Sequence, residues 1–130
     1  MSKAPIISVI DDDESVRIAM KSLLSSIGMI VHLFASAEDF LQSAYVSDTA
    51  CLITDVQMAG MSGIELQRTL IAQDQHMPII FITAVLEENI WARLLKAEAV
   101  CLLGKPFDEQ TLLQCLNIAL KTNRDEDVMQ

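Results

Sequence analysis

Short apolar runs alternate along the chain with longer segments in which apolar residues recur every three or four positions. The runs are too short for helices and predict five strands, at Ile6–Ile10, Ile30–Phe34, Ala50–Thr54, Ile79–Thr83 and Val100–Leu103. The segments between them have helical spacing, most clearly the first, from Val16 to Ile27, and the last, from Leu112 to Leu120. The pattern is therefore a strand followed by a helix, repeated five times.

Polar residues mark where the helices begin and end. Ser36, Ser62 and Asp108 each supply a side-chain oxygen for the unpaired N–H groups of a first turn, and Ser62 with Glu65 fits a capping box. Gly28 stands where the first helix would end. The middle strands are almost purely apolar, as expected of strands that helices cover on both faces. We therefore predict an α/β fold, a single doubly wound (βα)5 domain with a parallel sheet.

Length and charge narrow the class of protein. The chain has 130 residues, of which 52% are hydrophobic, and we expect one domain over residues 1–122 and a polar tail or truncated linker over 123–130. The net charge of -9 would repel a phosphodiester backbone, so we expect no direct binding of nucleic acid by this domain. The sequence contains no apolar stretch long enough to span a bilayer and no signal peptide, which predicts a cytoplasmic protein without membrane contact.

Three cysteines occur in apolar stretches. Cys51, Cys101 and Cys115 are odd in number and form no CxxC pair. We expect them to be small core residues rather than a disulfide framework or a zinc site.

Chemically active residues follow the predicted strands. Asp11 and Asp12 come after the first strand, Asp55 after the third, Thr83 ends the fourth and Lys105 follows the fifth. Because the carboxyl ends of parallel strands meet at one edge of a sheet, these side chains should lie together. Three neighbouring carboxylates need a cation, and oxygen ligands favour Mg²⁺. The lysine and the threonine could contact phosphate oxygens, so the group has the parts for phosphoryl transfer to a carboxylate.

Four stretches together resemble the receiver domains of two-component response regulators. They are VIDDDESVR (residues 9–17), CLITDVQMAGMSGIEL (51–66), PIIFITA (78–84) and LLGKPF (102–107). Each alone is a weak signal, but their order and their positions at strand ends are specific. The resemblance extends from Ile6 to about Lys121, and it implies a flavodoxin-like sheet with strand order 2-1-3-4-5.

The resemblance also implies a role for each site residue. Asp55 resembles the phosphoacceptor, Asp12 the direct ligand of Mg²⁺, Asp11 the acid that holds the metal through water, and the backbone carbonyl of Gln57 a further ligand.

Two more residues would contact the phosphoryl group. Thr83 would turn its hydroxyl toward the phosphoryl group, and Lys105 would pair with its oxygens. The Lys105–Pro106 bond is expected to be cis, which would aim the lysine into the site.

The family's function follows as an expectation. The phosphoryl donor would be a sensor histidine kinase or a histidine phosphotransfer protein, and the signal would pass through the fourth helix, the fifth strand and the fifth helix to an output domain or a homodimer. Such receivers often precede a helix-turn-helix DNA-binding domain. The domain would not be an enzyme in the ordinary sense, although self-catalysed phosphotransfer and slow autodephosphorylation are expected.

The chain departs from the family pattern at three positions. Ala59 replaces a frequent proline, which predicts a looser loop after Asp55, and Leu102 replaces the aromatic residue whose ring moves during switching. Glu98 replaces a glycine that closes the fourth helix, and we expect Trp91 on that helix to be partly exposed on the output face.

Other functions use related residues. An aspartyl-phosphate hydrolase needs a second acid two residues after the nucleophile, where this chain has Gln57. A pseudo-receiver that binds partners without phosphorylation is an alternative, because Ala59, Leu102 and Glu98 depart from the family pattern. A flavin-binding protein of the same fold would need a Ser/Thr/Gly-rich phosphate loop after the first strand, and none is present.

Overall fold

Five parallel strands form one sheet in the order β2-β1-β3-β4-β5. The computed structural model describes residues 4–84 and 101–128. The strands are β1 (Ile6–Ile10), β2 (Ile30–Phe34), β3 (Cys51–Asp55), β4 (Ile79–Thr83) and β5 (Cys101–Gly104). The flavodoxin-like strand order and the parallel pairing are confirmed. β3 ends one residue later than predicted, so Asp55 is the last residue of a strand rather than the first residue of a loop.

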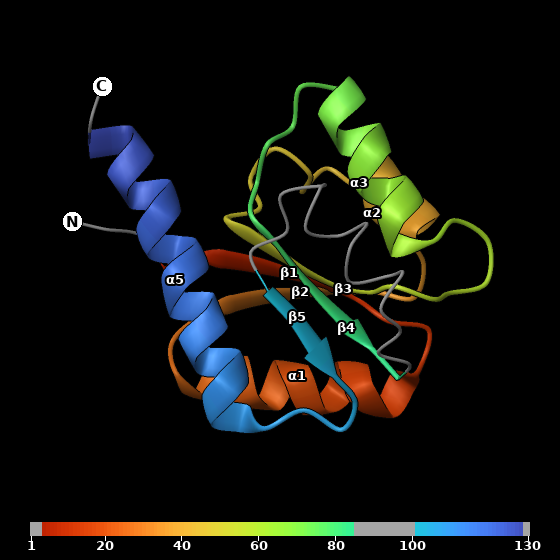
Figure 1. Cartoon of the computed structure of the whole chain (residues 1–130), viewed down its shortest axis with the longest axis horizontal. Coiled ribbons are helices and arrows are strands. Elements are labelled where there is room, and N and C mark those ends of the chain that lie inside the picture. The colour runs from red at the N-terminus through yellow and green to blue at the C-terminus, as the bar shows by residue number, and fades with distance from the viewer. Residues whose placement is uncertain (1–3, 85–100, 129–130) are drawn as a thin grey trace.

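Helices cover both faces of this sheet. They are α1 (Glu14–Ser26), α2 (Ala37–Gln42), α3 (Gly63–Ala72) and α5 (Glu109–Val128). α1 and α5 lie on one face, and α2 and α3 lie on the other (Figure 1). The helix expected between β4 and β5 falls in residues 85–100, outside the described residues, as do the expectations for Trp91 and Glu98.

Alternate residues of each strand enter two separate cores. Ile53 packs in the core beneath α1 and α5, whereas its neighbour Leu52 packs in the core beneath α2 and α3. Ile82 and Phe81 divide in the same way on β4. Because both faces of the strand are buried, every position favours an apolar side chain, and this explains the continuous apolar runs of the sequence.

The helix termini follow the predicted chemistry with one adjustment. The Ser62 side chain accepts from the Glu65 N–H and the Glu65 side chain accepts from the Ser62 N–H, which completes the capping box. Gly28 follows the end of α1 with a φ of 90°, in the left-handed region that glycine tolerates. The adjustment concerns α1, for which no N-cap was predicted: Asp13 is its N-cap, and the Asp13 carboxylate accepts from the Ser15 N–H at 2.9 Å.

The last helix is longer than the sequence pattern predicted. α5 continues to Val128, although polar composition predicted a tail or linker from residue 123. Polar residues such as arginine and glutamate are also good helix formers, so composition alone did not locate the helix end.

Cys101 and Cys115 form a disulfide, so the prediction that the cysteines form no disulfide framework is wrong for this pair. Their Cα atoms lie 6.1 Å apart because β5 packs against α5, and this distance suits a disulfide. Both residues do contribute to the core beneath α1 and α5, as predicted, and so does the unpaired Cys51.

No helix within residues 4–84 and 101–128 has the length and apolar character needed to cross a bilayer.

Candidate functional site

Three carboxylates meet at the carboxyl-terminal edge of the sheet. Asp11 and Asp12 follow β1 directly, and Asp55 ends the neighbouring β3. One carboxylate oxygen from each lies within 4.8 Å of the other two. Asp11 and Asp55 are only 2% and 7% exposed, whereas Asp12 is exposed. The cluster therefore has a buried base and one acid at the solvent side.

Lys105 supplies a positive charge at the base of this cluster. Its Nζ lies 2.8 Å from Asp11 Oδ2 and 2.8 Å from Asp55 Oδ2. The residue follows β5, and its backbone N–H donates to the Thr83 carbonyl at 2.8 Å, which extends the β4–β5 pairing by one step. The Lys105–Pro106 peptide bond is cis, as the family resemblance implied.

The protonation of these groups follows from burial and pairing. Burial raises the pKa of Asp11 above its usual value, although hydrogen bonds from Lys105 and from the Asp13 N–H act in the opposite direction. Burial acts to lower the pKa of Lys105, but its hydrogen bonds to Asp11 and Asp55 outweigh that effect, and the pKa is raised. Lys105 is therefore held as an ammonium ion against two carboxylates.

The donor set fits Mg²⁺. Carboxylate oxygens from three acids form a hard, oxygen-only set, and one acid is open to solvent, where waters can complete the coordination. Opposite ligands of Mg²⁺ are about 4.2 Å apart, so a spread of up to 4.8 Å suits a cluster in which one acid acts through water.

Thr83 and Gln57 lie beside the cluster. Thr83 is the fully buried last residue of β4, and its register partner Gly104 immediately precedes Lys105. The Gln57 N–H donates to Asp55 Oδ1 at 3.2 Å, so the backbone of Gln57 orients the acid. The predicted roles of the Thr83 hydroxyl and the Gln57 carbonyl stay predictions.

The loop after Asp55 has an anchor that sequence reasoning missed. Glu38 of α2 accepts from the Met61 N–H at 3.2 Å, and a Cβ at Gly60 would lie 2.6 Å from the same Glu38 Oε2. Gly60 has a φ of 79°. The loop that Ala59 was expected to loosen is thus tied to α2. The two partners are 23 positions apart in different elements, and no local motif signals such a contact.

The start of α3 touches the backbone of Asp55. A Cβ at Gly63 would lie 2.5 Å from the Asp55 carbonyl oxygen and 3.2 Å from the Phe81 ring. The Gly63 N–H also donates to the Val56 carbonyl at 2.9 Å. Only glycine therefore fits here, and it brings the helix N-terminus directly onto the end of β3.

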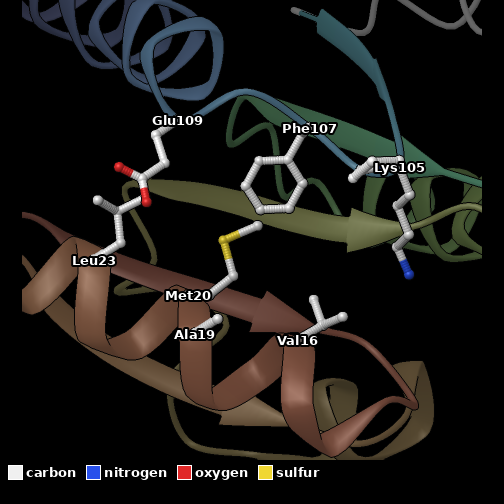
Figure 2. A pocket seen from close by; sticks show the side chains of 8 residues that line it. Val16, Ala19, Met20, Leu23, Lys105, Phe107 and Glu109 are labelled. Carbon is white, nitrogen blue, oxygen red and sulfur yellow. The ribbon is translucent and has the colours of Figure 1, made fainter.

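An apolar groove of about 500 Å³ lies beside Lys105. α1 forms one wall and the segment after β5 forms the other, with the Phe107 ring above Met20 (Figure 2). Lys105 lies at one end of the groove and Glu109 at the other. The lining residues are Val16, Ala19, Met20, Leu23, Lys105, Pro106, Phe107 and Glu109.

Comparison with known proteins gives one consistent family. Residues 7–117 match the model of the response regulator receiver domain. The chain is 41% identical over 119 residues to the response regulator protein TodT of Pseudomonas putida, covering 92% of this chain and 52% of that protein. It is 34% identical over 120 residues to the transcriptional regulatory protein FixJ of Azorhizobium caulinodans, covering 92% and 57%. The chain thus spans about half the length of these curated relatives.

Solved structures agree with this assignment. The response regulator StyR superposes with a TM-score of 0.89 at 40% identity, covering 97% of this chain and 64% of that one. The FixJ-N structure gives a TM-score of 0.81 at 31% identity, covering 92% and 96%. Response regulators act in two-component signalling with sensor kinases and are not classical enzymes. The chain belongs to the family of response regulator receiver domains.

Proposed function

We propose that Asp55 accepts a phosphoryl group from the phosphohistidine of a sensor histidine kinase or a histidine phosphotransfer protein, in a reaction that depends on Mg²⁺. The observation that carries this proposal is the convergence of Asp11, Asp12 and Asp55 with the Lys105 ammonium group at one sheet edge. A carboxylate beside a fixed cation and further acids is suited to receive a phosphoryl group.

In the proposed reaction, an Asp55 oxygen attacks phosphorus as the N–P bond of the donor breaks. The electron pair of that bond returns to the imidazole nitrogen, and an acyl phosphate forms on Asp55. Lys105, already 2.8 Å from the carboxylate, would pair with a phosphoryl oxygen, and the Thr83 hydroxyl would donate to another. In slow autodephosphorylation, water attacks the same phosphorus, the bond between phosphorus and the Asp55 oxygen breaks, and inorganic phosphate leaves while the Asp55 carboxylate is regenerated.

Mg²⁺, when bound, would neutralise charge on the phosphoryl oxygens. Asp11, Asp12, Asp55 and the Gln57 carbonyl are the groups that would hold it. Lys105 and the buried acids exclude bulk water from one side of the site, because Asp11 and Asp55 are almost fully buried.

The groove beside Lys105 suits the phosphohistidine donor as its docking surface. A donor must bring its histidine ring to Asp55. Lys105 contacts Asp55 and also lies at one end of the groove, so a donor bound in the groove would be next to Asp55 (Figure 2). The groove is lined mainly by apolar side chains such as Met20 and Phe107, which suits an apolar helix face of the donor.

The signal would leave through the face formed by the helix expected between β4 and β5, by β5 itself and by α5, toward an output domain or a second copy. In the described part of this face, Ile118 of α5 is 54% exposed, which supports a contact surface. Leu102 packs against the core beneath α2 and α3, so the proposed relay would work without a moving aromatic ring. The receiver domain over residues 1–122, its cytoplasmic location and the absence of nucleic acid binding belong to the same proposal.

A second candidate is a pseudo-receiver that binds partners without phosphorylation. The observation favouring it is that the Lys105 ammonium is paired with Asp11 and Asp55, so the two buried acids have a counter-ion without an added metal. Failure of both Mg²⁺ binding and phosphorylation would support this candidate.

The test is intact-protein mass spectrometry after incubation with Mg²⁺ and acetyl phosphate. We expect one phosphoryl adduct that requires Mg²⁺, is removed by hydroxylamine and is absent in Asp55→Asn. Asp48→Asn, at an exposed position away from the sheet edge, is the matched control and should keep the adduct. An adduct that persists in Asp55→Asn would refute the assignment of the acceptor.

A further inference from the structure

A disulfide joins the two ends of the segment that carries Lys105. Cys101 is the first residue of β5, and Cys115 lies in the second turn of α5. The two cysteines are 14 positions apart and bracket Lys105. Cys101 is partly exposed and Cys115 is buried. Cys101 is therefore the more accessible member of the pair for an oxidant or a reductant.

We propose that Cys101 and Cys115 are a reversible redox pair, whose disulfide clamps β5 to α5 and so fixes the segment that holds Lys105 beside Asp55. In the oxidised protein one covalent bond joins the two ends of this segment. In the reduced protein the segment is held by noncovalent contacts alone, which are the packing of Leu103 and Leu112, the β4–β5 pairing and the ion pairs of Lys105. Any effect on phosphorylation rests on the function proposed above.

The chemistry is thiol–disulfide exchange with a small disulfide such as glutathione disulfide. The Cys101 thiolate attacks one sulfur of the oxidant, forms a mixed disulfide and releases one glutathione thiolate. The Cys115 thiolate then attacks Cys101 Sγ and releases the second. The protein loses two electrons and two thiol protons, and one glutathione disulfide becomes two glutathione thiols. Excess glutathione reverses both steps.

Cys51, the third cysteine, is not expected to take part in thiol–disulfide exchange. Cys51 is fully buried in β3 and has no disulfide partner among the described residues. Its burial raises the pKa of the thiol to about 12, which leaves almost no thiolate at neutral pH. Cys51 therefore serves as an unreactive internal reference.

The expected compartment favours a reversible disulfide over a permanent structural one. Disulfides persist in oxidising compartments, whereas those of reducing compartments are mostly transient and redox-sensing. The protein is proposed to work with a kinase in the cytoplasm, which is a reducing compartment. We therefore expect the disulfide between Cys101 and Cys115 to form and to be reduced again. The distance of 6.1 Å between the Cα atoms shows that the fold already holds the partners in position.

The first experiment measures the oxidation state directly. The full chain is equilibrated at a series of ratios of glutathione to glutathione disulfide, quenched in acid, labelled with a maleimide after denaturation and mapped by mass spectrometry. We expect Cys101 and Cys115 to pass together between thiol and disulfide across the series, while Cys51 is a thiol throughout. A pair that stays reduced in pure glutathione disulfide, or stays oxidised in excess glutathione, would overturn the proposal.

The second experiment measures the clamp by hydrogen–deuterium exchange of the oxidised and reduced wild-type protein, without a mutation. We expect exchange in residues 102–115 to become several-fold faster on reduction, with α1 unchanged. Equal exchange in the two states would refute the clamp. Cys101→Ser should match the reduced protein under oxidising conditions, and the control Cys51→Ala should behave as wild type.

Acetyl phosphate labelling of the same two samples separates this proposal from the proposed function. A phosphorylation rate that differs between oxidised and reduced protein supports both. If neither sample is phosphorylated, the proposed function fails, while the thiol mapping and the exchange data still decide whether the redox clamp exists.

Discussion

Lys105 and Asp55 are 50 positions apart in the sequence, yet Lys105 Nζ lies 2.8 Å from Asp55 Oδ2. The same nitrogen is equally close to Asp11 Oδ2, so one ammonium group bridges two buried carboxylates. The lysine and a divalent cation would therefore compensate the same negative charge. This shared role leads to a prediction in which the effect of removing the lysine depends on the metal.

Replacing Lys105 should expose the repulsion within the acid cluster. Lys105→Ala is expected to lower the free energy of unfolding by about 2 kcal/mol without Mg²⁺. This is less than the cost of breaking a fully buried pair, because 21% of the lysine side chain is exposed. Mg²⁺ should stabilise the variant more than the wild type, since the ion would replace the missing charge. Urea unfolding with and without Mg²⁺ measures both effects.

The matched control is Lys21→Ala, which removes the same charge from an exposed position on α1. It should change stability little, and its response to Mg²⁺ should equal that of the wild type. A response to Mg²⁺ that is unchanged in Lys105→Ala would contradict the shared compensation of the carboxylates.

The anchor between Glu38 and the loop after Asp55 can be tested with two glycines. Gly60→Ala and Gly28→Ala both place a Cβ on a backbone of positive φ, which costs about 1–2 kcal/mol. Only the Cβ at position 60 would also displace Glu38 from the Met61 N–H, because position 28 has nothing within 4 Å. Gly60→Ala should therefore be more destabilising by about 0.5 kcal/mol in thermal unfolding.

The control experiment repeats Gly60→Ala and Gly28→Ala in a protein that also carries Glu38→Ala. Without the glutamate, the difference between the two alanine variants should vanish. A difference that persists would mean that the cost at Gly60 arises elsewhere.

A buried pair of hydroxyls predicts an unequal response to mutation. Ser8 Oγ lies 2.7 Å from Thr49 Oγ1, and Thr49 Oγ1 donates its proton to the Tyr45 carbonyl at 2.8 Å. Each hydroxyl has one proton, so Ser8 must donate to Thr49. Thr49→Val leaves the fully buried Ser8 hydroxyl without that acceptor and should cost about 1–3 kcal/mol. Ser8→Ala leaves the bond from Thr49 to Tyr45 intact and should cost less.

Equilibrium urea unfolding of both variants measures this asymmetry. The double variant should recover part of the loss in Thr49→Val, because no buried hydroxyl is then left without a partner. A larger loss for Ser8→Ala than for Thr49→Val would reverse the assigned direction of the hydrogen bonds.

Alkaline pH should destabilise the protein through Cys51. Burial raises the pKa of this thiol from 9.0 to about 12, so the folded protein favours the neutral form. The resulting stability is fully present below pH 9 and is lost as pH rises toward 12, by about 1.4 kcal/mol per pH unit. Cys51→Ala should show a shallower decline over this range in denaturant unfolding. Parallel declines for variant and wild type would show that Cys51 does not contribute.

Local chemistry explains what the sequence predicted correctly. Strands buried on both faces must be apolar throughout, so β3 and β4 were recognisable, and the Ser62–Glu65 capping box was complete within four residues. The proximity of Asp11, Asp55 and Lys105 followed from the rule that parallel strands end at one sheet edge.

Features that depend on tertiary distance were missed. The disulfide between Cys101 and Cys115 requires the packing of α5 on β5, and the contact from Glu38 to Met61 requires the position of α2 beside the loop. The number of cysteines and the spacing of these residues along the chain do not reveal that the disulfide or the Glu38 contact exists. The apolar groove was missed for the same reason, since its two walls come from opposite ends of the chain.

The contact of Gly63 with the Asp55 carbonyl has a consequence for mutational tolerance. A saturation library at this codon should return glycine alone, because even the smallest side chain would collide with backbone rather than with a movable side chain. The flanking positions are restricted by chemistry rather than by space: position 62 should accept other capping residues such as threonine or aspartate, and the buried position 64 other apolar residues. Position 63 would thus be the one of the three that accepts no replacement at all, although it has no side chain with which to do chemistry.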